Sequence, residues 1–232
     1  SSSADTDFYM YYSYASESVD GQNPSGVWDS NFVMVQHMGD SLVDSTGNGN
    51  DGTNYGSTVV DGLNGKARSF DGSNDYIGIT SIDFSTGNGD FTYQAVSNKL
   101  ATQAYGGIFT TLSTSAQSPI DIGAFLREEN TYGNYQIYDG ITTRSSSTTI
   151  PIGEYDSLAL RRLSNSFELF ERAVKTINGT TNVSFSNQRL VVGHCYTNIS
   201  SGEYYWNGTI DEVRISNIAR SDAWIKADDY NL

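Results

Sequence analysis

Residues that could carry catalysis are few and widely spaced in this chain. Hydrolysis through a nucleophile needs a neighbouring base, and the sequence offers two histidines, His37 and His194. Both follow apolar strand-forming runs, so we expect packed strand residues rather than catalysts. A glycosidase needs two cooperating carboxylates, whereas Asp211 and Glu212 are adjacent on a predicted strand and point to opposite faces. These patterns favour a protein that is not an enzyme.

Asp211 is nevertheless the most informative acidic residue. Strand alternation places it on the face that carries Val213 and Ile215, so its carboxylate points inward if that face is the core. A buried carboxylate must be hydrogen-bonded, paired or metal-bound, because its desolvation alone is unfavourable. Two interpretations remain open: Asp211 caps the backbone amides of a neighbouring loop, or it ligates calcium.

A loop that could supply further calcium ligands spans residues 44–52, with the sequence Asp-Ser-Thr-Gly-Asn-Gly-Asn-Asp-Gly. Oxygen-bearing side chains alternate there with glycines that permit tight turns. The loop starts like the calcium loop of helix–loop–helix proteins, but its twelfth position is Tyr55 instead of a bidentate glutamate. The sequence therefore leaves two readings, a calcium loop of a β-sandwich or a plain glycine-rich turn.

Composition and charge exclude several classes of partner. The chain has 232 residues and a net charge of −14, so it repels a nucleic-acid backbone and anionic lipids. A single cysteine, Cys195, excludes an internal disulfide framework and cysteine-rich zinc sites, and we expect it to be buried in a strand. No apolar run is long enough to span a bilayer, and the first residues read as a mature or trimmed N-terminus.

Glycosylation sequons and tyrosines are the remaining surface signals. The four Asn-x-Ser/Thr sequons begin at Asn178, Asn182, Asn198 and Asn207, and their clustering predicts one glycosylated edge. The 16 tyrosines could stack on sugars, line a protein interface or fill the core, and the sequence does not rank these roles.

Short β-rich runs separated by turn clusters predict an all-β, two-sheet sandwich. Strands are expected at residues 8–14, 32–38, 67–70, 76–79, 91–96, 107–112, 120–126, 135–138, 157–162, 167–170, 189–192 and 208–215. One helix is predicted near the C-terminus, capped by Ser221. Trp224 and Ala227 are expected to share its face toward a sheet edge.

Several motifs, taken in order, resemble laminin-G-like domains of the concanavalin A-like lectin/glucanase superfamily. They are the loop at 44–52, Gly-Lys-Ala-Arg-Ser-Phe-Asp-Gly-Ser-Asn-Asp-Tyr-Ile at 65–77, Phe-Thr-Tyr at 91–93, Asn-Gly-Thr-Ile-Asp-Glu-Val-Arg-Ile-Ser-Asn at 207–217 and Ser-Asp-Ala-Trp-Ile at 221–225. The resemblance covers about residues 32–232. It departs from the family at 94–98 and 154–157, where tryptophan-containing segments are usual.

The resemblance implies a jelly-roll sandwich, and often one structural calcium, to which Asp44, Asn48 and Asp211 would map. Members serve as adhesive or carbohydrate-binding modules. Catalytic members use a Glu-x-Asp-x-x-Glu strand, of which residues 120–123 keep only a fragment. We therefore expect a structural or adhesive subunit of a prokaryotic cell surface, outside the cell. The alternative is a carbohydrate-binding module of a secreted protein.

Residues 1–31 resemble the tail of a prokaryotic surface β-domain that precedes such modules, so we predict domains at 1–31 and 32–232. The first segment is aromatic at Phe8, Tyr9, Tyr11 and Tyr12. A strand without its own sheet must pair with another edge, because unpaired backbone groups are unfavourable. It either folds back onto its own sandwich or adds to a neighbouring subunit and builds a filament. Self-association, other surface proteins and glycans are thus the expected partners.

Overall fold

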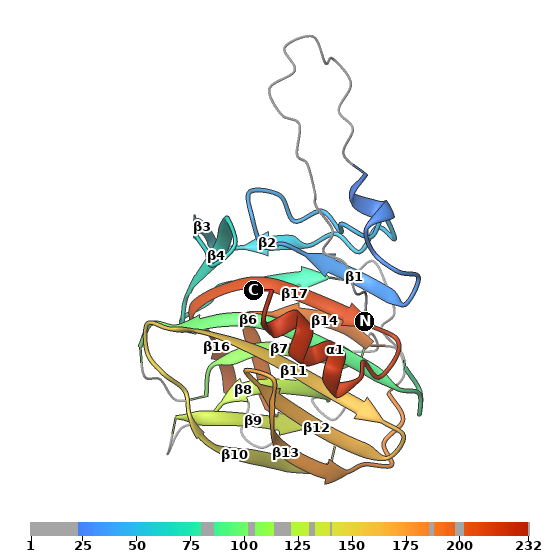
Figure 1. The fold of residues 1–232 in the computed structure, drawn as a ribbon. Coiled ribbons are helices and arrows are strands. Elements are labelled where there is room, and N and C mark those ends of the chain that lie inside the picture. The colour runs from blue at the N-terminus through green and yellow to red at the C-terminus, as the bar shows by residue number, and fades with distance from the viewer. Residues whose placement is uncertain are drawn as a thin grey trace, which may run out of the picture.

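The computed structural model describes residues 23–79, 86–101, 105–113, 122–129, 133–139, 141–185, 188–197 and 202–231. These residues build two antiparallel sheets that pack face to face, with a single helix on one outer side (Figure 1). The predicted all-β sandwich with a C-terminal helix is therefore confirmed. The predicted strand at 8–14 lies outside the described residues.

The sheet that carries the helix, here called the helix-side sheet, has eight strands. Its spatial order is β13 (Val174–Thr180), β12 (Ser166–Glu171), β11 (Tyr155–Leu163), β6 (Phe91–Lys99), β17 (Asn207–Ser216), β4 (Lys66–Asp71) and β3 (Thr58–Asp61), and β1 (Phe32–Gln36) also pairs with β17. Strand β17 pairs with β4 through residues 207–210 and with β1 through residues 213–216, so these two strands share one of its edges.

The opposite sheet, here called the hairpin-side sheet, has seven strands. Its order is β10 (Thr143–Thr149), β9 (Asn134–Tyr138), β8 (Ile122–Glu128), β7 (Gly107–Ser113), β14 (Gln188–Val192), β5 (Tyr76–Ile79) and β2 (Thr53–Tyr55). A separate hairpin of β15 (His194–Thr197) and β16 (Gly202–Tyr205) contacts β7 and β8. Figure 1 shows β16 behind this sheet, on the side away from the helix.

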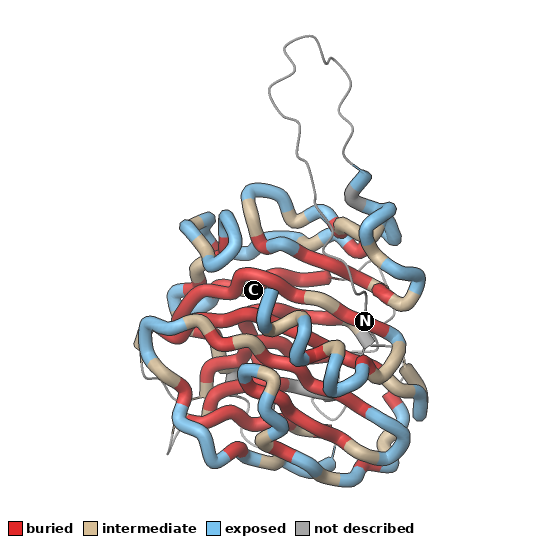
Figure 2. The backbone as a smooth tube through the Cα atoms, in the orientation of Figure 1, coloured by how far each residue is buried: buried red, intermediate tan, exposed pale blue. Residues whose placement is uncertain are grey.

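The core lies between the two sheets. Strand alternation sends Leu158 and Leu160 of β11 inward, while Ala159 between them faces the helix. Inward side chains of both sheets form one apolar cluster that includes Phe70, Ile77, Phe109, Ile137, Leu169, Trp206 and Ile215. Figure 2 shows that buried residues follow the strands of both sheets, whereas most exposed residues lie in the connections.

Helix α1 (Asp222–Asp229) covers the outer face of the helix-side sheet. Ser221 caps it as predicted, because its Oγ accepts a hydrogen bond from the Trp224 amide at 3.1 Å. The predicted packing face is half right: Trp224 packs against the cluster of Ala159, Phe170 and Ile225, whereas Ala227 is exposed. Ile225 is the buried residue of the helix, so the covered side is centred on Ile225 rather than between Trp224 and Ala227.

The β15–β16 hairpin approaches the outer face of the hairpin-side sheet closely. Thr110 Oγ1 donates to the His194 carbonyl at 2.9 Å. A Cβ atom on Gly107 would lie 2.2 Å from the Cys195 amide nitrogen, so this approach requires glycine at position 107. Cys195 of β15 is buried and packs against Leu112 and Val191 of the sheet, in agreement with its expected role as a small packed residue.

Residues 23–31 contact the sandwich directly. The Trp28 indole nitrogen donates to Ser45 Oγ at 3.0 Å, and Trp28 packs edge-on against Phe32 with ring centroids 5.0 Å apart. A short 3₁₀ turn, η1 (Pro24–Gly26), precedes this contact. The proposed boundary at residue 31 stays a prediction.

Candidate functional site

A row of aromatic side chains lies on the outer face of the hairpin-side sheet. Tyr76 directly precedes Ile77, a core residue of the same strand, so strand alternation turns Tyr76 outward. Tyr55 of the neighbouring edge strand stacks on it, with ring centroids 4.4 Å apart and planes 12° apart. Tyr55 is 48% exposed, so this stacked pair reaches solvent.

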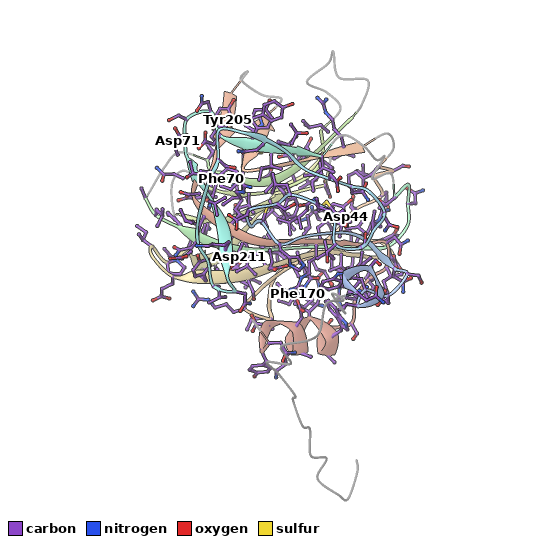
Figure 3. All side chains as sticks on the ribbon, turned by 90° about the horizontal axis from the view of Figure 1, so that it is seen from above. Asp44, Phe70, Asp71, Phe170, Tyr205 and Asp211 are labelled. Atoms are coloured by element: carbon purple, nitrogen blue, oxygen red, sulfur yellow. The ribbon has the colours of Figure 1, made fainter. Side chains whose placement is uncertain are left out.

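The hairpin extends this row. His194 lies 6.1 Å from Tyr76 between ring centroids, and it stacks on Tyr205 at 4.5 Å. Figure 3 shows Tyr205 on the side of the molecule opposite the helix. We call Tyr55, Tyr76, His194 and Tyr205 the aromatic row. Tyr76 and Tyr205 are partly buried and His194 is buried, so neighbouring atoms restrict the orientation of these three rings.

A polar network centred on Arg127 lies on the same sheet face. The Arg127 guanidinium is 4.4 Å from the centre of the Tyr105 ring and 5.7 Å from that of Tyr204. Its Nε and Nη2 donate to Gln136 Oε1 at 3.1 and 3.0 Å. Gln136 Nε2 in turn donates to Ser145 Oγ at 3.0 Å. We call these residues the Arg127 network.

Together, these two groups can bind a flat polar molecule. Aromatic rings pack against the C–H face of a sugar, while amide, hydroxyl and guanidinium groups bond its hydroxyls. Of the three roles left open for tyrosine, the structure shows the core role for Tyr93 and Tyr135, whereas Tyr55 is on the surface. Sugar stacking and a protein interface stay predictions. Burial raises the pKa of Tyr93 above its ordinary value.

Asp211 is buried, and it makes the loop-capping contacts that the sequence allowed. Its Oδ2 accepts hydrogen bonds from the amides of Leu63 and Asn64, at 2.6 and 3.0 Å, in the turn between β3 and β4. The pairing of β17 with β6 shifts between Ile210 and Val213, and this β-bulge interrupts the expected alternation. Burial raises the Asp211 pKa. Its Oδ1 has no hydrogen-bond partner among the described residues.

Asp44 holds its own loop against β1. Its Oδ1 accepts from the Val35 amide at 3.0 Å, and its Oδ2 accepts from the Asn50 amide at 3.1 Å. Asn48 Nδ2 donates to the carbonyls of Phe32 and Val33, both at 3.1 Å. Both side chains thus fix the path of residues 44–52.

The fit of calcium to these three residues is partial. Amide protons occupy both Asp44 oxygens, whereas Asp211 Oδ1 is a buried oxygen without a hydrogen-bond donor. Asp44 and Asp211 lie apart in Figure 3. Within the described ranges, no cluster of three or more His, Cys, Asp or Glu side chains could hold a metal. Calcium binding at Asp44, Asn48 and Asp211 stays a prediction.

His37 differs from the expected packed strand residue. It lies just beyond β1 with its side chain 51% exposed, and its Nδ1 is 2.8 Å from Glu212 Oε1. The strand ends at Gln36, so the alternation with Val33 and Val35 does not extend to His37. The hydrogen bond with Glu212 raises the His37 pKa above 6.5. His194 is buried, as expected.

The predicted sequons occupy different parts of the helix-side sheet. Asn178 is exposed on the edge strand β13, and Asn182 is exposed just beyond it. Asn207 begins β17, which lies between β6 and β4, so the described sequons do not share one edge. Asn198 lies outside the described residues, as do the predicted assembly residues Phe8, Tyr9, Tyr11 and Tyr12. Glycosylation and strand donation both stay predictions.

The two facing antiparallel sheets define a jelly-roll β-sandwich. Residues 71–226, more than half of the chain, match the family model described as the concanavalin A-like lectin/glucanases superfamily, of the laminin-G-like type. The chain belongs to this family, which confirms the resemblance seen in its motifs. A preceding prokaryotic β-domain has no support from the matches.

Solved structures share this fold at low sequence identity. Domain 4 of the extracellular arabinanase AbnA from Geobacillus stearothermophilus, in complex with arabinotriose, is 19% identical with a TM-score of 0.68; the match covers 85% of this chain and 97% of that one. The binding domain of Paraclostridial Mosquitocidal Protein 1 is 14% identical with a TM-score of 0.67, and the match covers 90% of this chain and 53% of that one.

The receptor-binding domain of a botulinum neurotoxin C/D mosaic is similar at 12% identity and a TM-score of 0.65, with 87% of this chain and 51% of that one covered. No match was found among curated proteins. In the described part of the chain, no helix is long and apolar enough to cross a membrane.

Proposed function

We propose that this chain is a non-catalytic, extracellular glycan-binding domain that holds neutral oligosaccharides on the outer face of its hairpin-side sheet. The observation that carries this proposal is the aromatic row with its exposed Tyr55, on the same sheet that carries the Arg127 network. The arabinotriose complex of the similar arabinanase domain supports the proposed ligand class. This function is the alternative raised by the sequence.

Stacking makes Tyr55 suited to this task. Tyr76 supports one face of the Tyr55 ring, so the ring is already oriented before a ligand arrives. A pre-oriented side chain loses less rotamer entropy on binding, and more of the contact energy becomes affinity. The exposed half of Tyr55 then offers apolar surface to one sugar ring. The Arg127 network lies on β8 and β9, whereas Tyr55 is on the edge strand β2, so the network can bond only the hydroxyls of a more distant unit of the same oligosaccharide.

Charge favours neutral sugars over acidic ones. A net charge of −14 repels sulfated or sialylated polymers at long range. Arg127 is buried and donates two hydrogen bonds to Gln136, so its guanidinium is not freely presented to an acidic glycan. We therefore expect neutral pentose or hexose oligosaccharides to bind better than acidic glycans of similar size.

The first function predicted from the sequence, a self-assembling adhesive subunit of a prokaryotic surface, has less support than glycan binding. A domain that binds glycans can also act as an adhesin, so the adhesive part of that prediction is compatible with this proposal. Filament formation depends on residues 8–14, and it is retained only as a prediction.

A glycan array followed by isothermal titration calorimetry tests the proposal. The array includes arabino-oligosaccharides, gluco-oligosaccharides and sialylated glycans. For the best neutral ligand, Tyr55→Ala should weaken binding about tenfold or more, which corresponds to ~1.4 kcal/mol. Tyr230→Ala is the matched control, because Tyr230 is an exposed tyrosine on the helix side of the sandwich.

The expected result is selective binding of a neutral glycan that Tyr55→Ala weakens and Tyr230→Ala leaves unchanged. Tyr205→Ala, at the other end of the aromatic row, should also weaken it. Absence of binding to every glycan on the array would overturn the proposal. So would a ligand whose affinity is insensitive to both Tyr55→Ala and Tyr205→Ala.

A further inference from the structure

At one end of the sandwich, the space between the sheets changes from apolar to acidic. Asp156 precedes the core residue Leu158 by two positions on β11, so both side chains point inward. Glu171 follows the core residue Leu169 by two positions on β12, and it points inward for the same reason. Each of these two acidic residues is only 4% exposed.

These carboxylates line a cleft of about 260 Å³ where the edges of the two sheets meet. Its other lining residues are Thr148, Thr149, Pro151, Arg172, Val174 and Thr176. Strands β10 and β13 form the two edges, and Figure 1 shows them side by side, farthest from β2 and β3. At the C-terminal end of β13, the Arg144 side chain reaches from β10 to β13, and its Nη2 donates to the Thr180 carbonyl at 2.7 Å.

The negative charge in this cleft is incompletely balanced. Asp156 has a cationic partner, because Arg172 Nε lies 3.2 Å from its Oδ1. Arg172 is half exposed and is shared with Glu154 at 3.4 Å. Glu171 Oε1 accepts a hydrogen bond from Thr176 Oγ1 at 2.6 Å. Among the described residues, Glu171 has no ion-pair partner.

The second oxygen of Glu171 is the decisive atom. Glu171 Oε2 is buried and has no hydrogen-bond partner by distance and angle in the described part of the chain, although the hydroxyls of Ser146 and Thr148 lie near the carboxylate and oppose the rise of its pKa. The Tyr135 side chain faces Asp156 and Glu171 from the opposite sheet, and it brings no positive charge. Burial raises the pKa of both Asp156 and Glu171. A buried carboxylate oxygen in this position needs a proton or a cation.

We propose that the Asp156–Glu171 cleft is a binding site for a divalent cation, with calcium as the best-fitting ion. Two carboxylates and the hydroxyls of Thr148, Thr149 and Thr176 provide oxygen donors, which hard cations prefer. The lining residues include no histidine or cysteine, the nitrogen and sulfur ligands that select zinc or copper. The one lining side chain with nitrogen atoms is Arg172, and a guanidinium is not a metal ligand.

The size of the cleft sets the form in which the ion binds. A water molecule takes about 30 Å³ of liquid volume, so about 260 Å³ holds an ion together with several waters. Calcium completes a shell of six to eight oxygens with such waters. The site is distinct from the calcium ligands predicted at Asp44, Asn48 and Asp211, which lie on other elements.

The test measures calcium and magnesium binding to the chelator-treated full chain by calorimetry, and terbium binding by luminescence. Tyr135 lies beside the site, so its ring should sensitise bound terbium. Glu171→Gln keeps the shape of the side chain and removes its charge. Glu154→Gln is the matched control, because Glu154 is exposed and shares Arg172 without lining the cleft. Asp211→Asn removes a predicted ligand of the loop site, so calcium binding that persists in this variant does not depend on the Asp211 charge.

We expect calcium to bind, with at least tenfold weaker affinity for this site in Glu171→Gln and no change in Glu154→Gln or Asp211→Asn. Terbium luminescence should fall in Glu171→Gln alone. No binding at about 1 mM calcium, the weak end for extracellular modules, would overturn the proposal. Unchanged affinity in Glu171→Gln would also overturn it, because the bound calcium would then lie outside this cleft. Neither outcome bears on glycan binding, which Tyr55→Ala tests separately.

Discussion

Arg220 and Asp29, 191 positions apart in the sequence, form a two-pronged ion pair. Arg220 Nη1 lies 2.7 Å from Asp29 Oδ2, and Nη2 lies 3.1 Å from Oδ1. The same guanidinium stands 4.3 Å from the Phe32 ring centre and 4.8 Å from that of Trp224. One buried arginine thus joins the segment before β1 to the start of α1.

This ion pair predicts a dependence of stability on acid. The Arg220 guanidinium lowers the Asp29 pKa from 3.8 to about 2. A carboxyl with a lowered folded pKa stabilises the fold above its unfolded pKa, and this stabilisation is lost as the pH falls through the folded value. Asp29→Asn should therefore be less stable than wild type at pH 7, and the difference should shrink between about pH 4 and pH 2.

Urea unfolding at several pH values measures this difference. Because Asp29 is about half exposed, we expect less than ~1 kcal/mol at pH 7. Asp61→Asn is the control, since its ion pair with Lys66 is on the surface and should contribute nothing measurable. A constant difference between Asp29→Asn and wild type across the whole pH range would contradict the prediction.

His37 predicts the opposite dependence on pH. Its hydrogen bond to Glu212 raises the His37 pKa above 6.5, so the charged form is favoured in the folded state. This contribution is complete below about pH 6.5 and is lost as the pH rises through the raised pKa. In an NMR titration, Glu212→Gln should move the His37 midpoint down toward 6.5. An unchanged midpoint would show that the hydrogen bond is absent in solution.

Calcium at the loop site remains to be tested separately. If Asp211 Oδ1 accepts the ion, calcium should raise the melting temperature over that in chelator, because a ligand of the folded state stabilises it by mass action. The rise should be several degrees, and Asp211→Ala should lose part of it. Measuring this in the Glu171→Gln background removes the contribution of the cleft. Identical melting curves with calcium and chelator in that background would refute calcium binding at the loop.

Strongly patterned segments were predictable from the sequence. The strand at 76–79 carries isoleucine at alternate positions and has the expected bounds, and Ser221 caps the helix, because both depend on local chemistry. Edge strands β10 and β13 were missed, because their Thr- and Ser-rich sequences resemble loops and they are stabilised by pairing with β9 and β12. Pairing between distant segments leaves little local signal.

The candidate site was less predictable than the fold. Tyr55, Tyr76 and Tyr205 come from β2, β5 and β16, and only the sheet topology and the hairpin bring them together. The two isoleucines at alternate positions, Ile77 and Ile79, were a usable signal that Tyr76 points to the opposite face. The inward direction of Asp156 and Glu171 could also have been read from alternation, but only after the strands β11 and β12 had been paired.

Gly107 controls the hairpin that carries half of the aromatic row. An added Cβ would lie 2.2 Å from the Cys195 amide nitrogen and 2.4 Å from the His194 carbonyl carbon, closer than real contacts allow. Gly107→Ala should therefore push β15 away from β7 and cost about 1–3 kcal/mol, the usual range for overpacking. Because His194 moves with β15, glycan affinity should fall in the same variant.

Gly39→Ala is the control, since its nearest neighbour would be Lys66 Cβ at 3.6 Å, an ordinary contact. Thermal melts and glycan calorimetry on both variants check this prediction. A Gly107→Ala protein as stable as Gly39→Ala, with unchanged glycan affinity, would show that the hairpin tolerates displacement and does not position the row.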